Sequence, residues 1–152
     1  MKEVRGDVFD LMKGDFQVFC VTTNGFIKNN GECVMGAGIA KTVKRLFPIL
    51  PKKLGTLLKK YGNKVFILHK YEDGSILTFP VKHNWWEDAD IELIKTSCKE
   101  LMRILDKNTH IKKVLLPRPG CGNGKLKWVN VKPIIEPLLD DRVYVANNDE
   151  VK

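Results

Sequence analysis

The sequence predicts an α/β domain of three layers (α/β/α), in which helices cover both faces of a central mixed sheet of about six strands. Short runs of β-branched and aromatic residues alternate with helical patterns along most of the chain, and one hairpin pattern adds an antiparallel pair to an otherwise parallel sheet. The chain has 152 residues, 43% of them hydrophobic, which suits one compact core. We therefore expect residues 1–152 to form a single domain.

The first half of the chain predicts one buried strand and two helices. Residues 18–22 are β-branched and aromatic, which is typical of a buried strand. From Gly38 onward, apolar residues recur at helical spacing until Pro48, and a second helical pattern in residues 54–61 stops at Gly62.

The second half begins with the hairpin and continues with two helices and two strands. Residues 65–69 and 76–79 predict the paired strands, with a turn at residues 72–74. Apolar residues at helical spacing predict a helix over 91–105, capped by Asp88 or Asp90, and a last helix over 131–138. Residues 114–116 and 143–146 predict two further strands.

The charge and the hydropathy pattern narrow the class of protein. The net charge is +8, which favours either an anionic partner, such as a nucleic acid at a basic surface, or solubility alone. No apolar run approaches the length of about 20 residues that spans a bilayer, and residues 1–7 lack a signal-peptide core. We expect a soluble, cytoplasmic protein that makes no membrane contact.

The cysteines and histidines are scattered. No pair of the four cysteines has the spacing of a zinc or redox motif, and the three histidines lie far from one another. We expect no metal and no cofactor, and we interpret Cys20 and Cys98 as small buried hydrophobic residues.

Two glycine-rich segments, residues 35–40 and 120–124, follow predicted strands and are interpreted as leading into helices. Glycine permits positive φ and a close approach of backbone N–H groups to a ligand, and helix N-termini attract anions. Because ligands of α/β sheets bind at the carboxyl ends of strands, the two segments together favour a nucleotide-like ligand held by its diphosphate. Neither segment completes the motifs of P-loop NTPases or NAD-dependent dehydrogenases, so we disfavour those classes.

The order of four motifs resembles the macro domain family over nearly the whole chain. The resemblance is strongest to the branch of the DarG antitoxins and the terminal ADP-ribose protein glycohydrolases, and residues 79–85 and 124–128 resemble DarG segments. The four motifs are residues 6–8, 22–24, 34–41 and 117–124.

The resemblance implies a pocket for ADP-ribose and a catalytic role for Lys82. Asp7 would accept a hydrogen bond from the adenine amino group, with the Val8 backbone beside it, and Asn24 would reach the distal ribose. The remaining positions would line the diphosphate: Gly36, Ala37, Gly38 and Ile39 on one side, and Gly120, Cys121, Gly122 and Asn123 on the other.

Three departures from the family pattern affect this expectation. Residues 22–24 keep only the last position of the family's Asn-Ala-Ala-Asn stretch, and residues 25–33 lengthen the loop expected over the distal ribose. Gly124 stands where glycohydrolase relatives carry an aspartate, although DarG-like members also have glycine there.

Simpler interpretations stay open for several of these residues. Asp7 is also a candidate helix N-cap, Asn24 a turn residue, and Cys121 a small loop residue. Trp85 and Trp86 suggest either a base-stacking surface or a packed pair at the pocket rim.

The leading functional hypothesis is an ADP-ribosyl hydrolase that removes ADP-ribose from a modified macromolecule, with a DNA base as the favoured adduct. The resemblance suggests that the Lys82 amine attacks the anomeric carbon of the distal ribose, or its opened form. The alternatives are a non-catalytic module that binds ADP-ribose or a related signalling nucleotide, an ADP-ribose 1″-phosphate phosphatase, and a plain nucleic-acid-binding protein. The identity of the adduct and the existence of a toxin partner stay open.

Overall fold

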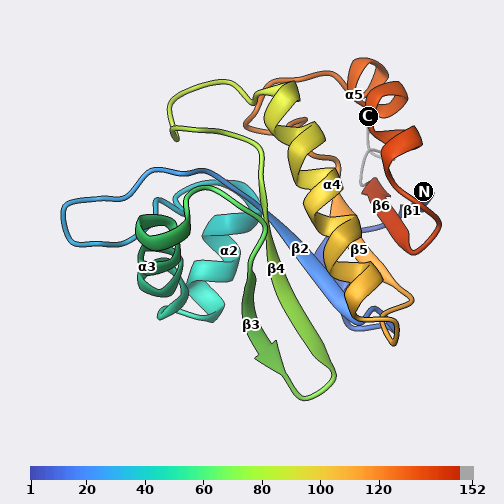
Figure 1. The fold of residues 1–152 in the computed structure, drawn as a ribbon, viewed down its shortest axis with the longest axis horizontal. Helices are drawn as coiled ribbons and strands as arrows, with labels where there is room; N and C mark the ends of the chain where they lie inside the picture. Colours follow the sequence, from blue (N-terminus) through green and yellow to red (C-terminus); the bar gives the residue numbers. More distant parts are fainter. Residues whose placement is uncertain (148–152) are drawn as a thin grey trace.

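The computed structural model describes residues 1–147, and residues 148–152 of the expected domain lie outside the described part. Six strands form one sheet in the order β1-β6-β5-β2-β4-β3 (Figure 1). Among the sheet strands of the described residues, only β3 and β4 pair in antiparallel fashion, which confirms the predicted mixed sheet. The strands are β1 (Lys2–Arg5), β2 (Val18–Thr23), β3 (Ile67–Tyr71), β4 (Gly74–Pro80), β5 (Val114–Pro117) and β6 (Val143–Asn147).

Side chains of the buried strands alternate between two cores, one on each face of the sheet. Cys20 of β2 belongs to the core that α4 (Ile91–Lys107) and α5 (Trp128–Ile135) cover. Its neighbour Phe19 belongs to the core that α2 (Gly38–Leu46) and α3 (Leu50–Tyr61) cover. Because successive residues of a strand point to opposite faces, this division produces the three-layer α/β/α fold that the sequence predicts.

Three details of the fold differ from the sequence prediction or refine it. The edge strand β1 was not predicted from the sequence, because its residues are mostly polar and exposed. The last helix ends at Ile135 and a 3₁₀ turn (Glu136–Leu138) follows, since Pro137 lacks the N–H that an α-helix needs. Of the two candidate caps of α4, Asp90 accepts a hydrogen bond from the Glu92 N–H at 2.9 Å.

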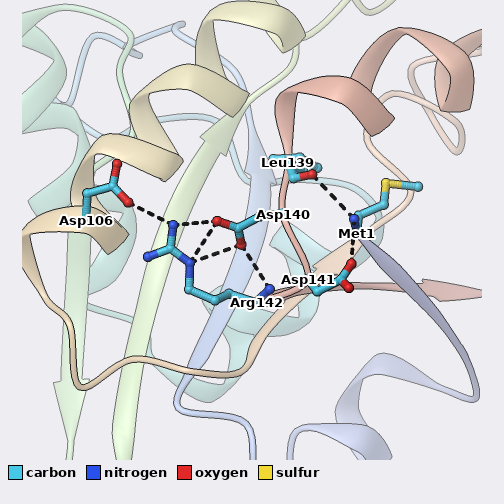
Figure 2. Close-up of polar contacts among 6 residues, drawn as sticks. All are labelled: Met1, Asp106, Leu139, Asp140, Asp141 and Arg142. Atoms are coloured by element: carbon cyan, nitrogen blue, oxygen red, sulfur yellow. Dashed lines mark hydrogen bonds and ion pairs between the residues drawn. The ribbon is translucent and has the colours of Figure 1, made fainter.

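A polar cluster joins α4 to the beginning of β6, away from the carboxyl ends of the strands. The Arg142 guanidinium donates to the Asp106 carboxylate at 2.8 Å and to that of Asp140 at 2.6 Å (Figure 2). The bond from Arg142 holds the pKa of Asp140 below its usual value, and the same bond raises the pKa of Arg142. The ammonium group of Met1 lies 3.1 Å from the Asp141 carboxylate in the same region.

None of the helices within residues 1–147 combines the length and the apolar character needed to cross a membrane.

Candidate functional site

The carboxyl ends of three neighbouring strands bring together the chain segments that form a cavity. β2, β4 and β5 end at Thr23, Pro80 and Pro117, and β2 pairs in parallel with both of the others. The segments that follow these strands enclose a cavity of about 620 Å³, which we name the first cavity. It lies at the sheet edge where α/β proteins bind their ligands.

Both glycine-rich segments line the first cavity, as the sequence predicts. Gly36, Ala37, Gly38 and Ile39 contribute from one side, and Gly120, Gly122 and Asn123 from the other. α2 begins at Gly38 with no side-chain cap and no acidic residue in its first turn. Its first N–H groups therefore remain available to an anion. The second segment differs from the prediction, because it leads into residues 125–127 before α5 begins at Trp128.

A second cavity of about 720 Å³ adjoins the first, and Asp7, Val8 and Cys121 line it. None of these three residues lines the first cavity. Residues that line both cavities mark their junction: Gly38, Ile39, Pro117, Arg118 and Gly122. The two cavities thus form an elongated site whose middle lies between the glycine-rich segments.

The glycines of this site serve two different purposes. Gly38 and Gly120 have positive φ values of 59° and 78°, so their backbone conformation favours glycine. Gly122 lies outside that region, and a Cβ atom placed on it would meet no protein atom within 4 Å. Gly122 therefore does not need the positive φ that glycine permits, and its missing side chain instead leaves the junction open.

Lys82 lines the first cavity on the segment that follows β4. The Thr23 carbonyl accepts hydrogen bonds from the N–H groups of Val81, at 2.9 Å, and of Lys82, at 3.4 Å. Asn63 donates to the Lys82 carbonyl at 2.9 Å, so the backbone is held on both sides. Lys82 is half-buried as a residue, and its amine donates to the Trp85 carbonyl at 3.2 Å.

The Asn24 side chain lines the same cavity, but its amide holds the loop that follows. The amide donates to the Val34 carbonyl at 2.9 Å and accepts from the Phe26 N–H at 3.0 Å. This is the turn role that we weighed against ribose contact. The loop is further closed by an antiparallel bridge between Ile27 and Cys33.

Asp7 is the helix N-cap that we weighed against ligand contact. Its Oδ1 atom accepts a hydrogen bond from the Phe9 N–H at 3.1 Å and caps the short helix α1 (Val8–Leu11). The residue also lines the second cavity, where its carboxylate has a second oxygen to offer.

Comparison with known proteins finds relatives in sequence and in structure. No family model matches the chain. The chain is 28% identical over 138 residues to the human ADP-ribose glycohydrolase OARD1, covering 90% of this chain and 82% of that protein. It is 27% identical over 113 residues to the DNA ADP-ribosyl glycohydrolase of Thermus aquaticus, covering 70% of this chain.

The solved structures identify the fold. The macrodomain of Mycobacterium tuberculosis DarG aligns with a TM-score of 0.77 at 24% identity, covering 97% of each chain. The chain has the macro domain fold. A structure described as Thermosipho africanus DarTG in complex with ADP-ribose aligns with a TM-score of 0.75 at 24% identity, covering 97% of the macro domain and 41% of that chain. The macro domain spans only 31% of the length of the Thermus aquaticus relative.

Arg118 lies at the junction of the two cavities, although no ligand contact is predicted for it from the sequence. Its guanidinium carbon lies 4.8 Å from the centroid of the Trp128 ring, and its Nη2 atom lies 3.8 Å from the Glu3 carboxylate. A hydrogen bond from Lys132 is the main cause that lowers the pKa of Glu3. The signal for Arg118 was present, because it stands inside the 117–124 motif.

The Thr23 hydroxyl is a second polar group of the site for which the sequence predicts no role. Thr23 lines the first cavity, and its hydroxyl has no hydrogen-bond partner among the described residues. A buried hydroxyl without a partner costs about 1–3 kcal/mol. A polar ligand in this cavity would provide the missing partner.

Three cysteines behave as expected of buried thiols. Cys20, Cys33 and Cys98 are buried, and burial raises the pKa of Cys33 and of Cys98 to about 12. Within residues 1–147, no group of three or more His, Cys, Asp or Glu residues is arranged to hold a metal ion.

Proposed function

We propose that this macro domain is an ADP-ribosyl hydrolase that removes ADP-ribose from a modified macromolecule, with a DNA base as the favoured adduct. The observation that carries the proposal is that Lys82 and both glycine-rich segments line one cavity. That cavity continues into a second one, which Asp7 and Val8 line. Each cavity has the volume of a typical small-molecule site, and the two together suit a dinucleotide-like ligand.

In the proposed binding mode, the adenine lies in the second cavity and the distal ribose in the first. Asp7 accepts a hydrogen bond from the adenine amino group, with the Val8 backbone beside it, and Cys121 lines the same end. The diphosphate lies at the junction, between the N-terminus of α2 and the segment at Gly122. Backbone N–H groups there stabilise its negative charge.

Lys82 acts as the nucleophile in this proposal. Its neutral amine forms a bond to the anomeric carbon of the distal ribose while the bond from that carbon to the base breaks. The amine gives up a proton and the leaving base gains one. Water then adds to the same carbon and breaks its bond to Lys82, which releases ADP-ribose and restores the amine. The two cavities contribute by holding the ribose in a fixed position.

Three observations favour a DNA adduct over a protein adduct. The net charge of +8 suits a polyanionic substrate. The Thermus aquaticus relative is named a DNA ADP-ribosyl glycohydrolase. A Cβ atom at Gly124 would lie 2.5 Å from the Gly120 carbonyl oxygen, so the aspartate of the glycohydrolase pattern does not fit there.

A second candidate function is binding of ADP-ribose without hydrolysis. The hydrogen bond between the Lys82 amine and the Trp85 carbonyl favours this candidate, because it occupies the group that would react. The residues that would bind ADP-ribose are the same in both cases. Only an assay of turnover separates the two functions.

The test is to incubate the protein with ADP-ribosylated single-stranded DNA and to measure free ADP-ribose by chromatography. ADP-ribosylated protein and ADP-ribose 1″-phosphate serve as parallel substrates. Release from the DNA adduct at the highest rate supports the proposal. Tight binding of ADP-ribose with no turnover of any substrate supports the binding module instead.

A further inference from the structure

Three aromatic side chains gather at the mouth of the first cavity, beside Lys82. Trp85 and Phe26 line the cavity, and Trp86 contacts both of them. The Trp85 and Trp86 rings meet edge to face at 5.6 Å, and the Phe26 and Trp86 rings at 5.3 Å. Despite these contacts, Trp85 is 51% exposed and Trp86 is 58% exposed. Two large exposed indoles at a cavity mouth offer apolar surface to a ligand.

Hydrogen bonds fix the backbone that carries the two tryptophans. The Glu87 carboxylate accepts from the Asn84 N–H at 2.9 Å and from the Asn84 amide at 3.0 Å, and the Glu87 N–H donates to the Asn84 carbonyl. On the other side, His83 lies 2.7 Å from the Asp90 carboxylate, at the cap of α4. The turn between Asn84 and Glu87 is thus held closed, which lowers the entropy lost when a ligand binds.

This aromatic surface lies where the group bonded to ADP-ribose would leave the cavity, and not where ADP-ribose itself would bind. Asp7 and the junction lie towards the second cavity, whereas Trp85 lines the first cavity next to Lys82. In the proposed binding mode, Lys82 faces the anomeric carbon, which is the atom that carries the adduct. The group bonded to that carbon therefore leaves the cavity beside Trp85.

We propose that Phe26, Trp85 and Trp86 form an aromatic platform that stacks a nucleobase of a single-stranded nucleic acid, at or next to the ADP-ribosylated base. This inference rests on the proposed function and names the substrate class of the same site. Every base has a π-face, so aromatic stacking suits single strands of any sequence.

The surrounding charge agrees with this occupant. The net charge of +8 attracts a phosphate backbone. Lys28, two residues after Phe26 in the loop of residues 25–33, also lines the first cavity. Lys28 also pairs with Glu32 at 3.5 Å, an exposed contact that leaves its ammonium accessible to a phosphate. A protein-linked ADP-ribose presents a flexible side chain instead of a flat ring, and gains less from the platform.

The test measures binding in the Lys82→Ala background, so that no substrate is consumed. The probes are free ADP-ribose, a single-stranded oligonucleotide with ADP-ribose on one base, the unmodified oligonucleotide, and an ADP-ribosylated peptide. Trp85→Ala and Trp86→Ala are added singly, with Tyr61→Ala as the control. Tyr61 is a comparably exposed aromatic residue, at 52%, and lines neither cavity.

We expect each tryptophan variant to bind the modified oligonucleotide about 5- to 150-fold more weakly. Binding of ADP-ribose and of the peptide should be unchanged, and Tyr61→Ala should behave as the parent. Unchanged affinity for the modified oligonucleotide would overturn the platform, as would an equal loss for ADP-ribose or for the peptide. Failure of the proposed hydrolysis is a separate result, because it appears as absence of turnover in the wild type while these binding differences persist.

Discussion

The amine nitrogen of Lys82 lies 3.2 Å from the carbonyl oxygen of Trp85, three residues further along the chain. The same short segment therefore carries the proposed nucleophile and the exposed aromatic ring at the cavity mouth. A substrate that contacts Trp85 thus lies where it can affect the hydrogen bond that holds Lys82.

The open space at Gly122 provides a test of the binding site that spares the fold. A valine at this position would meet no protein atom near its Cβ, yet it would project at the junction where we expect the diphosphate. We expect Gly122→Val to keep the melting temperature and to lose ADP-ribose binding in calorimetry. The matched control is Gly120→Val, which we expect to unfold at a lower temperature, because Gly120 has a φ of 78° and a Cβ there would lie 2.9 Å from Ile94. Full affinity in a folded Gly122→Val protein would refute the proposed position of the diphosphate.

Two substitutions of Asp7 separate its capping role from its proposed contact with the ligand. Asp7→Asn keeps an oxygen for the Phe9 N–H, so we expect little change in melting temperature. Its remaining atom would be an NH₂ donor facing the adenine amino group, and ADP-ribose affinity should fall. Asp7→Ala should lose affinity and also about 0.5–2 kcal/mol of stability. If Asp7→Asn bound ADP-ribose as the wild type does, Asp7 would be a cap and nothing more.

The pair of Asp140 and Arg142 predicts a defined pH dependence of stability. The hydrogen bond from Arg142 lowers the pKa of Asp140 in the folded state. The ionised Asp140 therefore contributes its full stabilisation of the fold above the unfolded pKa of about 3.9, and this stabilisation is lost as the pH falls through the lower folded pKa. Asp140→Asn should lower the melting temperature by about 1–3 °C near neutral pH, because exposed ion pairs contribute little. The difference between the two proteins should vanish in strong acid. A difference that is constant from neutral pH to strong acid would exclude the ion pair as its cause.

Much of the fold could be predicted from the sequence because buried elements carry strong patterns. The strand residues around Phe19 and the helix residues around Leu101 are apolar and lie in the two cores. The spacing of their apolar residues along the sequence therefore predicts a strand and a helix correctly. Strand β1 lacks such a signal, since it is an edge strand with polar side chains and takes its conformation from pairing with β6. The end of the last helix depends on Pro137, which the apolar pattern ignores.

The sequence predicts which segments meet at the site, but not the backbone conformation or the contacts of each residue in them. Glycine-rich segments at strand ends could be expected to meet, and they do so around Gly38 and Gly122. Composition does not tell which glycine has positive φ and which one only leaves space. Nor does it reveal that Arg118 lies at the junction or that the Thr23 hydroxyl lacks a partner among the described residues, because both depend on contacts between distant segments.

The measurement that tests the central claim most directly compares wild type, Lys82→Ala and Lys82→Arg on ADP-ribosylated single-stranded DNA, with free ADP-ribose as the readout. We expect both variants to lose hydrolysis by about 100-fold or more while still binding ADP-ribose, because a guanidinium keeps the charge but cannot deprotonate to attack. Hydrolysis by Lys82→Arg at the wild-type rate would contradict the nucleophile assignment, and a wild type that binds ADP-ribose but is as inert as Lys82→Ala would contradict the enzyme itself.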